Sequence, residues 1–160
     1  QVFISASAIG WYGDSGNRAV VESDSVGNDF LAAVCREWEG AADLAGDVRT
    51  VKLRTGLVLD PTGGALGRML PLFRFGLGGK LGSGKQWWSW ITLHDQIRAM
   101  VFLMNSKVEG AVNLTSPNPV TNQELLPVAR TGISVGKISA TCHKSAANET
   151  IPTNIYTPVK

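Results

Sequence analysis

The chain has 160 residues, of which 44% are hydrophobic and 18% charged, and this composition is typical of a globular protein with one domain or a piece of one. It excludes the disordered, fibrous and membrane-spanning classes, because no apolar stretch reaches the roughly 18 residues that a membrane span needs. The net charge of +2 comes from scattered basic residues, and the two cysteines lie far apart. We therefore expect a cytoplasmic protein with no nucleic-acid, membrane or metal partner.

The first segment of the chain predicts a ligand crevice. Residues 2–7 form a short apolar run that ends in small hydroxyl residues, and a Tyr-Gly turn follows at 12–13. Such a run predicts a buried parallel strand, and ligand crevices lie outside the carboxyl ends of parallel strands. Neither an initiator Met nor a glycine-rich phosphate loop precedes it, so we expect a fold that lacks its N-terminal half.

A helix and a strand are expected next. The helix covers 29–46, begins at Asn28 or Asp29 and ends at Gly46, and its apolar face holds Phe30, Val34 and Trp38, which we interpret as core residues. The strand covers 49–55 and continues through 56–59, and a turn follows at 60–64.

The second half of the chain continues the alternation. Its expected elements are a short helix over 65–75 that bends or ends near Pro71, a glycine-rich loop over 76–84, an extended segment over 87–91, a helix over 93–104, a strand over 110–115 and a capping box at 121–124. One side of the 93–104 helix holds Leu93, Ile97, Met100, Val101 and Met104. This order predicts an α/β fold with a parallel sheet. No period holds in the region 127–160, which we expect to be a poorly ordered or atypical tail.

Several segments together resemble one family. In chain order they are 3–14 (FISASAIGWYGD), 28–39 (NDFLAAVCREWE), 54–59 (RTGLVL), 63–66 (GGAL), 78–91 (GGKLGSGKQWWSWI) and 113–122 (NLTSPNPVTN). The chain resembles the atypical and extended short-chain dehydrogenase/reductases, and more narrowly the epimerase-family oxidoreductases labelled cell-division inhibitors. The resemblance implies a partial Rossmann-like, doubly wound parallel sheet. Residues 1–126 would form the C-terminal part of an NAD(P)-binding domain with its substrate lid.

The catalytic residues that the resemblance implies are only partly present. The family places a Ser or Thr at the end of the first strand, and Ser7 matches it, with Ser5 as the alternative register. The Tyr and Lys of the family's Tyr-x-x-x-Lys pair fall on Phe30 and Val34, which cannot transfer a proton. Tyr12 is the nearest substitute in sequence, and its alternative role is to pack the turn.

By the same resemblance, NAD or NADP would bind without the usual phosphate loop. The expected cofactor-binding residues are Ser5, Ala6, Thr55, Gly56, Leu57 and Val58. Gly56 would admit a close backbone approach, or would merely fit a bend. The expected substrate-binding residues are Arg54, Gln86, Trp87 and Trp90. An arginine at a strand end often pairs with a carboxylate instead, and tryptophans here could equally be core or interface anchors.

The sequence therefore predicts part of an NAD(P)-dependent epimerase/dehydratase-like oxidoreductase that acts on a small molecule such as a sugar nucleotide. The alternative is a non-catalytic dinucleotide-binding or regulatory protein, because Phe30 and Val34 replace the proton-transfer pair. We expect this chain alone to be inactive, to bind NAD(P) very weakly and to leave an unpaired apolar sheet edge.

Overall fold

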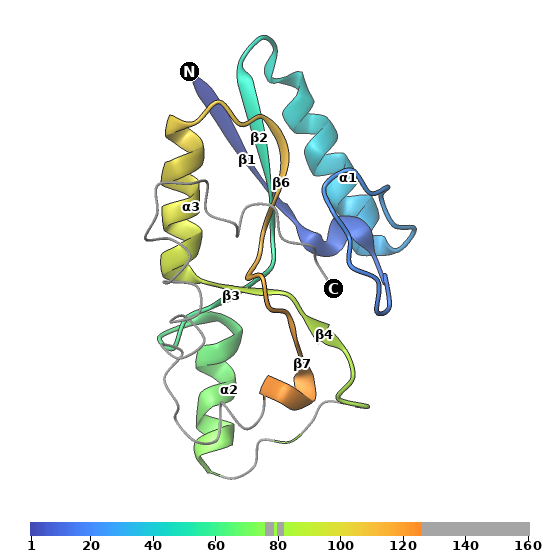
Figure 1. Ribbon diagram of the computed structural model, residues 1–160, viewed down its shortest axis with the longest axis vertical. Coiled ribbons are helices and arrows are strands. Elements are labelled where there is room, and N and C mark those ends of the chain that lie inside the picture. Colours follow the sequence, from blue (N-terminus) through green and yellow to red (C-terminus); the bar gives the residue numbers. More distant parts are fainter. Residues whose placement is uncertain (76–78, 80–81, 126–160) are drawn as a thin grey trace.

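The structure is a computed structural model that describes residues 1–75, 79 and 82–125. Its main sheet contains β1 (Val2–Ala8), β2 (Arg49–Thr55) and β6 (Gly110–Leu114) in the order β1-β2-β6. Both neighbouring pairs are parallel, which confirms the predicted α/β fold. Helices α1 (Phe30–Ala42) and α3 (Leu93–Asn105) flank this sheet (Figure 1). Among the described residues, β1 has a strand partner on one side only, so the predicted unpaired edge is present.

The two faces of the main sheet differ in chemistry. Because side chains alternate along a strand, each strand gives one set of residues to α3 and the other set to α1. The apolar core lies on the α3 face and contains Val51, Leu53, Leu103, Val112 and Leu114, with Ile91 beside them. Arg54, which follows Leu53, and Asn113, which lies between Val112 and Leu114, face α1 instead and are buried polar groups.

Helix α1 begins where the sequence predicts but buries a different face. The Asp29 side chain accepts a hydrogen bond from the Ala32 backbone N–H and is the N-cap. The buried residues are Ala32, Cys35, Glu39 and Ala42. The predicted core face is wrong, since Phe30 is 78% exposed and Trp38 is 51% exposed. The small side chains of Ala32, Cys35 and Ala42 face the sheet and let the helix approach its polar groups, which Glu39 contacts. The short 3-10 helix η2 (Asp43–Ala45) then ends at Gly46, as predicted.

The predicted apolar side of α3 is also wrong. The residues Leu93, Ile97, Val101 and Met104 are all exposed, whereas Leu103 is fully buried and Met100 packs against the core from a partly buried position. Strand β5 (Trp90–Thr92) leads directly into α3, with Thr92 as the N-cap. Because no loop separates strand and helix, the strand fixes which side of the helix meets the sheet.

Two small sheets form the lower part of Figure 1. Strand β3 (Leu57–Leu59) pairs in parallel with β5, and β4 (Trp87–Trp88) pairs antiparallel with β7 (Val120–Thr121). The expected continuous strand over 49–59 is therefore wrong, because the chain changes sheets at Gly56. A Cβ atom on Gly56 would overlap the Ser89 carbonyl oxygen and lie 2.8 Å from Thr115 Cγ2. The close backbone approach predicted at Gly56 is thus made by the protein's own chain.

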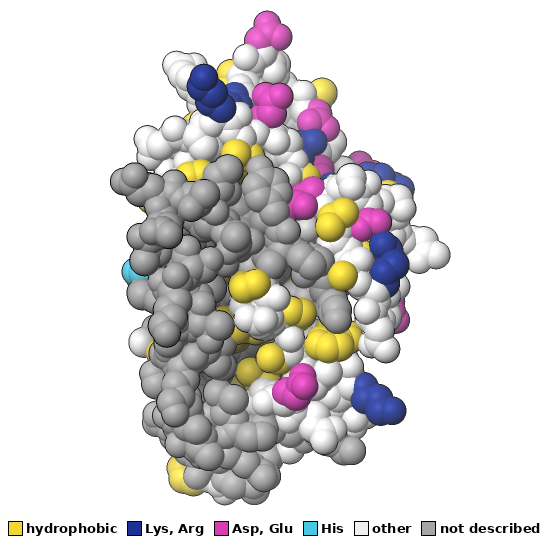
Figure 2. All heavy atoms as spheres, viewed as in Figure 1, with side chains coloured by type: hydrophobic (Ala, Val, Ile, Leu, Met, Phe, Trp, Pro, Cys, Tyr) yellow, Lys and Arg dark blue, Asp and Glu magenta, His cyan; other side chains and the backbone are white. Residues whose placement is uncertain are grey.

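The remaining elements follow the sequence. Helix α2 (Gly64–Arg74) continues through Pro71, so of the two expected alternatives the helix does not end at the proline. The capping box is present, because Glu124 Oε2 accepts from the Thr121 backbone N–H at 2.7 Å, and Thr121 Oγ1 accepts from the Glu124 N–H at 3.3 Å. Residues 76–78 and 80–81 of the predicted loop and the whole predicted tail lie outside the described residues. Basic and acidic side chains are interspersed on the face shown in Figure 2.

Candidate functional site

The strand register brings three polar residues into one row across the main sheet. Ser7 of β1 lies opposite Arg54 of β2, and Arg54 lies opposite Asn113 of β6. All three are buried, and all face α1. The row lies near the carboxyl ends of the three strands, which is where open parallel sheets place ligands.

A buried ion pair joins this row to α1. The Arg54 guanidinium donates to both oxygens of Glu39, from Nε at 2.8 Å and from Nη2 at 2.9 Å, and the two side chains are only 4% and 5% exposed. The guanidinium also lies 4.0 Å from the centroid of the Trp11 ring. Ser7 Oγ donates to Glu39 Oε1 at 2.7 Å. Arg54 therefore shows the alternative that the sequence left open, which is pairing with a nearby carboxylate.

Tyr12 closes the network from the 3-10 helix η1 (Ile9–Tyr12). Its hydroxyl donates to Asn113 Oδ1 at 2.6 Å and accepts from Arg54 Nη1 at 3.1 Å. Burial raises the pKa of the Tyr12 phenol, and the nearby Arg54 opposes this effect without cancelling it. The phenol thus stays neutral at physiological pH and is engaged on both sides. This geometry matches the turn-packing alternative, and a proton-transfer role would require Tyr12 to exchange its present partners.

A cleft lies beside this network, at the carboxyl end of β1. It has a volume of about 620 Å³ and is lined by Ile9, Gly10, Tyr12, Gly13, Asp14, Ser15, Gly16, Asn17, Leu31, Ser83, Lys85, Gln86 and Trp87. Among the predicted site residues, the cleft brings together Tyr12, Gln86 and Trp87. The Trp87 indole N–H donates to Asn17 Oδ1 at 2.8 Å, which joins segments that are 70 residues apart. A volume in this range is typical of small-molecule sites.

The other predicted site residues lie elsewhere. Trp90 is 2% exposed, donates from its indole N–H to the Asn118 carbonyl oxygen at 3.0 Å and packs with Leu59, so it is a core residue. Leu57 packs in the same cluster, and Val58 packs against the main core. Thr55 Oγ1, at the end of β2, accepts from Gln96 Nε2 at 3.1 Å.

The first-strand residues Ser5 and Ala6 keep part of their surface accessible. Ser5 is partly buried, Ala6 is exposed, and Ser5 Oγ donates to the Ala6 carbonyl oxygen at 3.3 Å. Because neighbouring strand residues face opposite sides, Ser5 lies on the α1 face and Ala6 on the α3 face. They would therefore contact different parts of a bound molecule.

The sequence did not predict Glu39 and Glu22, which are hydrogen-bond partners of the predicted site residues. Glu39 lies seven positions after Ala32 and four after Cys35, so it shares their buried helix face, but the larger apolar residues masked this pattern. Glu22 accepts the Asn113 backbone N–H at 2.9 Å and offers its own carbonyl oxygen to Arg54 at 3.0 Å. Its position in a polar loop carries no sequence signal for either contact.

Within the described part of the chain, no group of three or more His, Cys, Asp or Glu side chains is arranged to hold a metal ion. The helices of that part are all too short or too polar to cross a membrane.

The parallel sheet, its flanking helices and the cleft at its carboxyl edge place the chain in the Rossmann-like α/β class, as part of such a fold. No family model matches the chain. It is 52% identical over 124 residues to an epimerase family protein of Mycobacterium tuberculosis, a match that covers 76% of this chain and 41% of that protein. The chloroplastic SDR39U1 homolog of Arabidopsis thaliana, also an epimerase family protein, is 46% identical over 126 residues, which cover 78% of this chain and 36% of the relative.

Two solved structures agree with these relatives. The human epimerase family protein SDR39U1, crystallised with NADPH, has a TM-score of 0.74 and 32% identity, and the match covers 80% of this chain and 46% of that one. The nucleoside-diphosphate sugar epimerase from Corynebacterium glutamicum has a TM-score of 0.72 and 35% identity, over 95% of this chain and 32% of that one. These matches confirm the predicted resemblance to epimerase family proteins, and the chain spans 41% of the length of its mycobacterial relative.

Proposed function

We propose that the chain provides the substrate-side part of an NAD(P)-dependent oxidoreductase of the epimerase and dehydratase type, which acts on a small molecule such as a sugar nucleotide. The observation that carries the proposal is the match to the human relative solved with NADPH, at 32% identity and a TM-score of 0.74. The cleft beside β1 supports it, because it lies at the edge of the sheet where ligands bind in this fold class.

The residues at the end of β2 fit a nicotinamide cofactor. Gln96 Oε1 is buried and has no hydrogen-bond partner among the described residues, while Gln96 Nε2 is held by Thr55. A buried acceptor without a partner is costly, and the carboxamide N–H of a nicotinamide would satisfy it. In this proposal Ser5, Ala6 and Thr55 border the cofactor, which supplies hydride transfer when bound.

Other residues of the chain would position and bind the substrate. Gln86 and Trp87 line the cleft and would contact the substrate directly. Ser7 has donated its hydroxyl hydrogen to Glu39, so it would meet a ligand as a hydrogen-bond acceptor. Arg54 would act through the network that holds Ser7 and Tyr12 rather than through direct contact.

The test is a calorimetric titration of the product of the complete reading frame that contains these residues, with NADH and NADPH. We expect one of the two to bind, and we expect Gln96→Leu to weaken binding by about tenfold, since one hydrogen bond is lost. The 160-residue chain by itself should bind either cofactor more weakly than about 1 mM. The absence of binding heat for both cofactors with the complete product would refute the proposal.

A non-catalytic dinucleotide-binding or regulatory protein is the second candidate. Two observations favour it: Phe30 is 78% exposed at the position of the missing tyrosine, and the Tyr12 phenol is already engaged by Asn113 and Arg54. This candidate predicts cofactor binding without turnover. Turnover can be monitored through the absorbance of the nicotinamide. Any oxidation or reduction of the cofactor with an alcohol or carbonyl compound would count against this candidate.

A further inference from the structure

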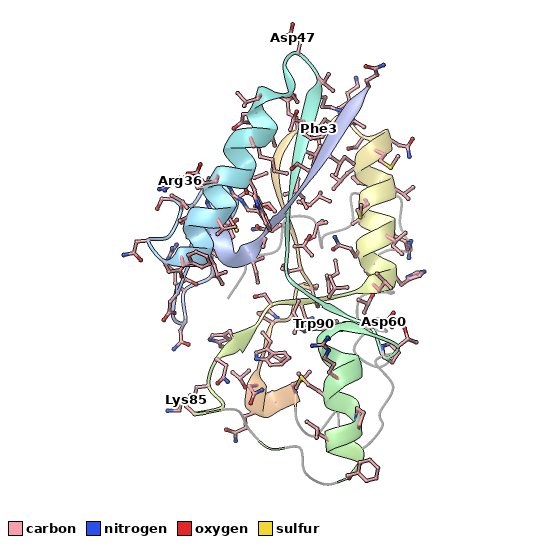
Figure 3. The ribbon with its side chains drawn as sticks, turned by 180° about the vertical axis from the view of Figure 1, so that it is seen from behind. Phe3, Arg36, Asp47, Asp60, Lys85 and Trp90 are labelled. Carbon is pink, nitrogen blue, oxygen red and sulfur yellow. The ribbon has the colours of Figure 1, made fainter. Side chains whose placement is uncertain are left out.

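The two edges of the main sheet differ in how they are covered. At the β6 edge, the Asn113 backbone N–H points away from β2 and donates to Glu22 Oε1 at 2.9 Å. At the opposite edge, β1 pairs with β2 on one side, and no strand of the described residues pairs with it on the other. Alternate backbone N–H and C=O groups of β1 therefore point outward. Figure 3 shows this strand, with Phe3, between α1 and α3.

Strand β1 has none of the features that normally keep an open edge from pairing with another chain. Residues Val2–Ala8 (VFISASA) include no charged side chain and no proline. They form an uninterrupted parallel ladder with β2, so no bulge disturbs the strand. Proteins commonly place lysine, proline or a bulge at an exposed edge, because an unprotected edge pairs with a further strand. The β1 edge is therefore suited to accept one.

Two exposed aromatic residues lie beside this edge. Phe3, on the α1 face of β1, is 42% exposed, and Trp38 of α1 is 51% exposed. Asp43, directly after α1, pairs with Lys52 of β2 at 2.6 Å, so this flank of the helix faces β2. Trp38 lies about 140° around the helix from Asp43, because each residue turns the helix by about 100°. The flank that carries Trp38 therefore faces the β1 side.

The residues of β1 are complementary to a second, antiparallel copy of the same strand. When Ser5 lies opposite Ser5 of that copy, three kinds of pair form, and each joins a large apolar side chain to a small one: Val2 with Ala8, Phe3 with Ser7, and Ile4 with Ala6. Both members of each pair lie on the same face of the sheet. The two-fold axis through Ser5 closes this contact, so the assembly ends at two copies.

The same register covers both aromatic residues. Ser7 Oγ is bonded to Glu39 Oε1 at 2.7 Å, and Trp38 directly precedes Glu39 in α1. Phe3 of the second copy, which lies opposite Ser7, is then beside Trp38. The two-fold axis repeats this contact, so both partly exposed rings of each copy are buried. Aromatic pairs of this kind are favourable beyond the area that they bury.

We propose that the β1 edge joins two copies of this chain into a dimer with one continuous sheet, in which β1 pairs antiparallel with β1 of the second copy and Phe3 packs against Trp38. A seven-residue edge is only about 23 Å long, whereas stable interfaces bury about 800 Å² on each partner. We therefore expect a dissociation constant between about 1 and 100 μM. The inference concerns assembly and is independent of the proposed function.

The experiment is sedimentation equilibrium of the 160-residue chain from about 1 μM to about 1 mM, with hydrogen exchange of residues 2–8 followed by mass spectrometry at both ends of this range. We expect the mass to rise from one chain to two. Residues 2–8 should exchange more slowly at the high concentration, because their outward N–H groups become hydrogen-bonded. A segment of the same chain that covered the edge would slow exchange equally at both concentrations, and that result overturns the proposal.

Charge substitutions test the register. Phe3→Glu and Trp38→Lys should each weaken association about tenfold, because each removes a buried ring and introduces an unpaired charge. The two changes combined in one chain should associate more tightly than either alone, since opposite charges then meet across the two-fold axis. Ile97 of α3 is the matched control, because its exposure of 52% equals that of Trp38 within 1%, and Ile97→Lys should associate as the parent does.

Circular dichroism at the low concentration distinguishes a loss of association from a loss of folding. Trp38→Lys, on the helix surface, keeps the test decisive if Phe3→Glu fails to fold. The proposal is overturned if the mass stays at one chain up to about 1 mM, or if Ile97→Lys weakens association as much as Trp38→Lys. It is also overturned if the folded combined variant associates no more tightly than the single ones.

Discussion

Replacing Glu39 by Gln tests the buried ion pair between Glu39 and Arg54. The substitution leaves Arg54 buried without a counter-charge, although the Tyr12 hydroxyl and the Glu22 carbonyl oxygen remain beside it. Removing one partner of a buried ion pair typically costs about 3–5 kcal/mol, and the two surviving contacts place the expected loss near the lower end, at about 3 kcal/mol. The measurement is urea unfolding followed by circular dichroism, with the midpoint lowered and the slope unchanged.

Two control variants distinguish the loss of the buried ion pair from a general effect of removing a charge on the free energy of unfolding. Glu37→Gln alters the same helix at a side chain that is 80% exposed, and it should change the free energy of unfolding by less than about 1 kcal/mol. Glu39→Leu combined with Arg54→Met removes both charges and should cost less than the sum of the single changes. The reasoning is refuted if Glu39→Gln costs no more than Glu37→Gln, or if the double change is strictly additive.

Three further outcomes are expected. Folding raises the pKa of the Tyr12 phenol above its unfolded value of 10.0, so the free energy of unfolding is at its full value below about pH 10 and falls as the pH rises through the folded-state pKa. Tyr12→Phe should remove the part of the alkaline loss of stability that comes from this phenol. An unchanged alkaline unfolding profile in Tyr12→Phe would contradict the prediction. Gly56→Ala should destabilise by about 2–3 kcal/mol because its Cβ meets the Ser89 backbone, while Gly40→Ala, with open space around it in α1, should stabilise by about 0.5–1 kcal/mol in the same urea assay. Replacing Phe30 and Trp38 with Gln should reduce the binding of a hydrophobic dye and change the free energy of unfolding by less than about 1 kcal/mol, since both side chains are more than half exposed; a larger loss would show that they are core residues after all.

Local signals in the sequence predicted most elements of the fold. The Asp29 cap, the stop at Gly46 and the Thr121–Glu124 capping box all act within a few residues, so their hydrogen bonds could be anticipated from spacing alone. The parallel β1-β2-β6 sheet followed from the alternation of strands and helices. The helix faces were predicted wrongly because the largest apolar residues were taken as the inward ones.

The candidate site was predicted in part. Tyr12, Gln86 and Trp87 do line one cleft, and Ser7 lies beside Arg54 at the end of the sheet. Their partners were not predicted, because Asn17 meets Trp87 across 70 residues and Asn113 meets Tyr12 across 101. Contacts of this kind depend on how the loop and the 3-10 helix after β1 pack against distant strands, which a single sequence does not reveal.

By itself, the order of residues determined the fold class, the family resemblance and most helix ends, since each of these depends on neighbours along the chain. The tertiary structure alone decided that Glu39 is buried, that Arg54 is neutralised by it, and that the chain changes sheets at Gly56. The physical reason is that burying a charged side chain is costly unless it is paired and hydrogen-bonded, and here the partner charge comes from another element of the fold. That meeting is set by how α1 packs on the sheet.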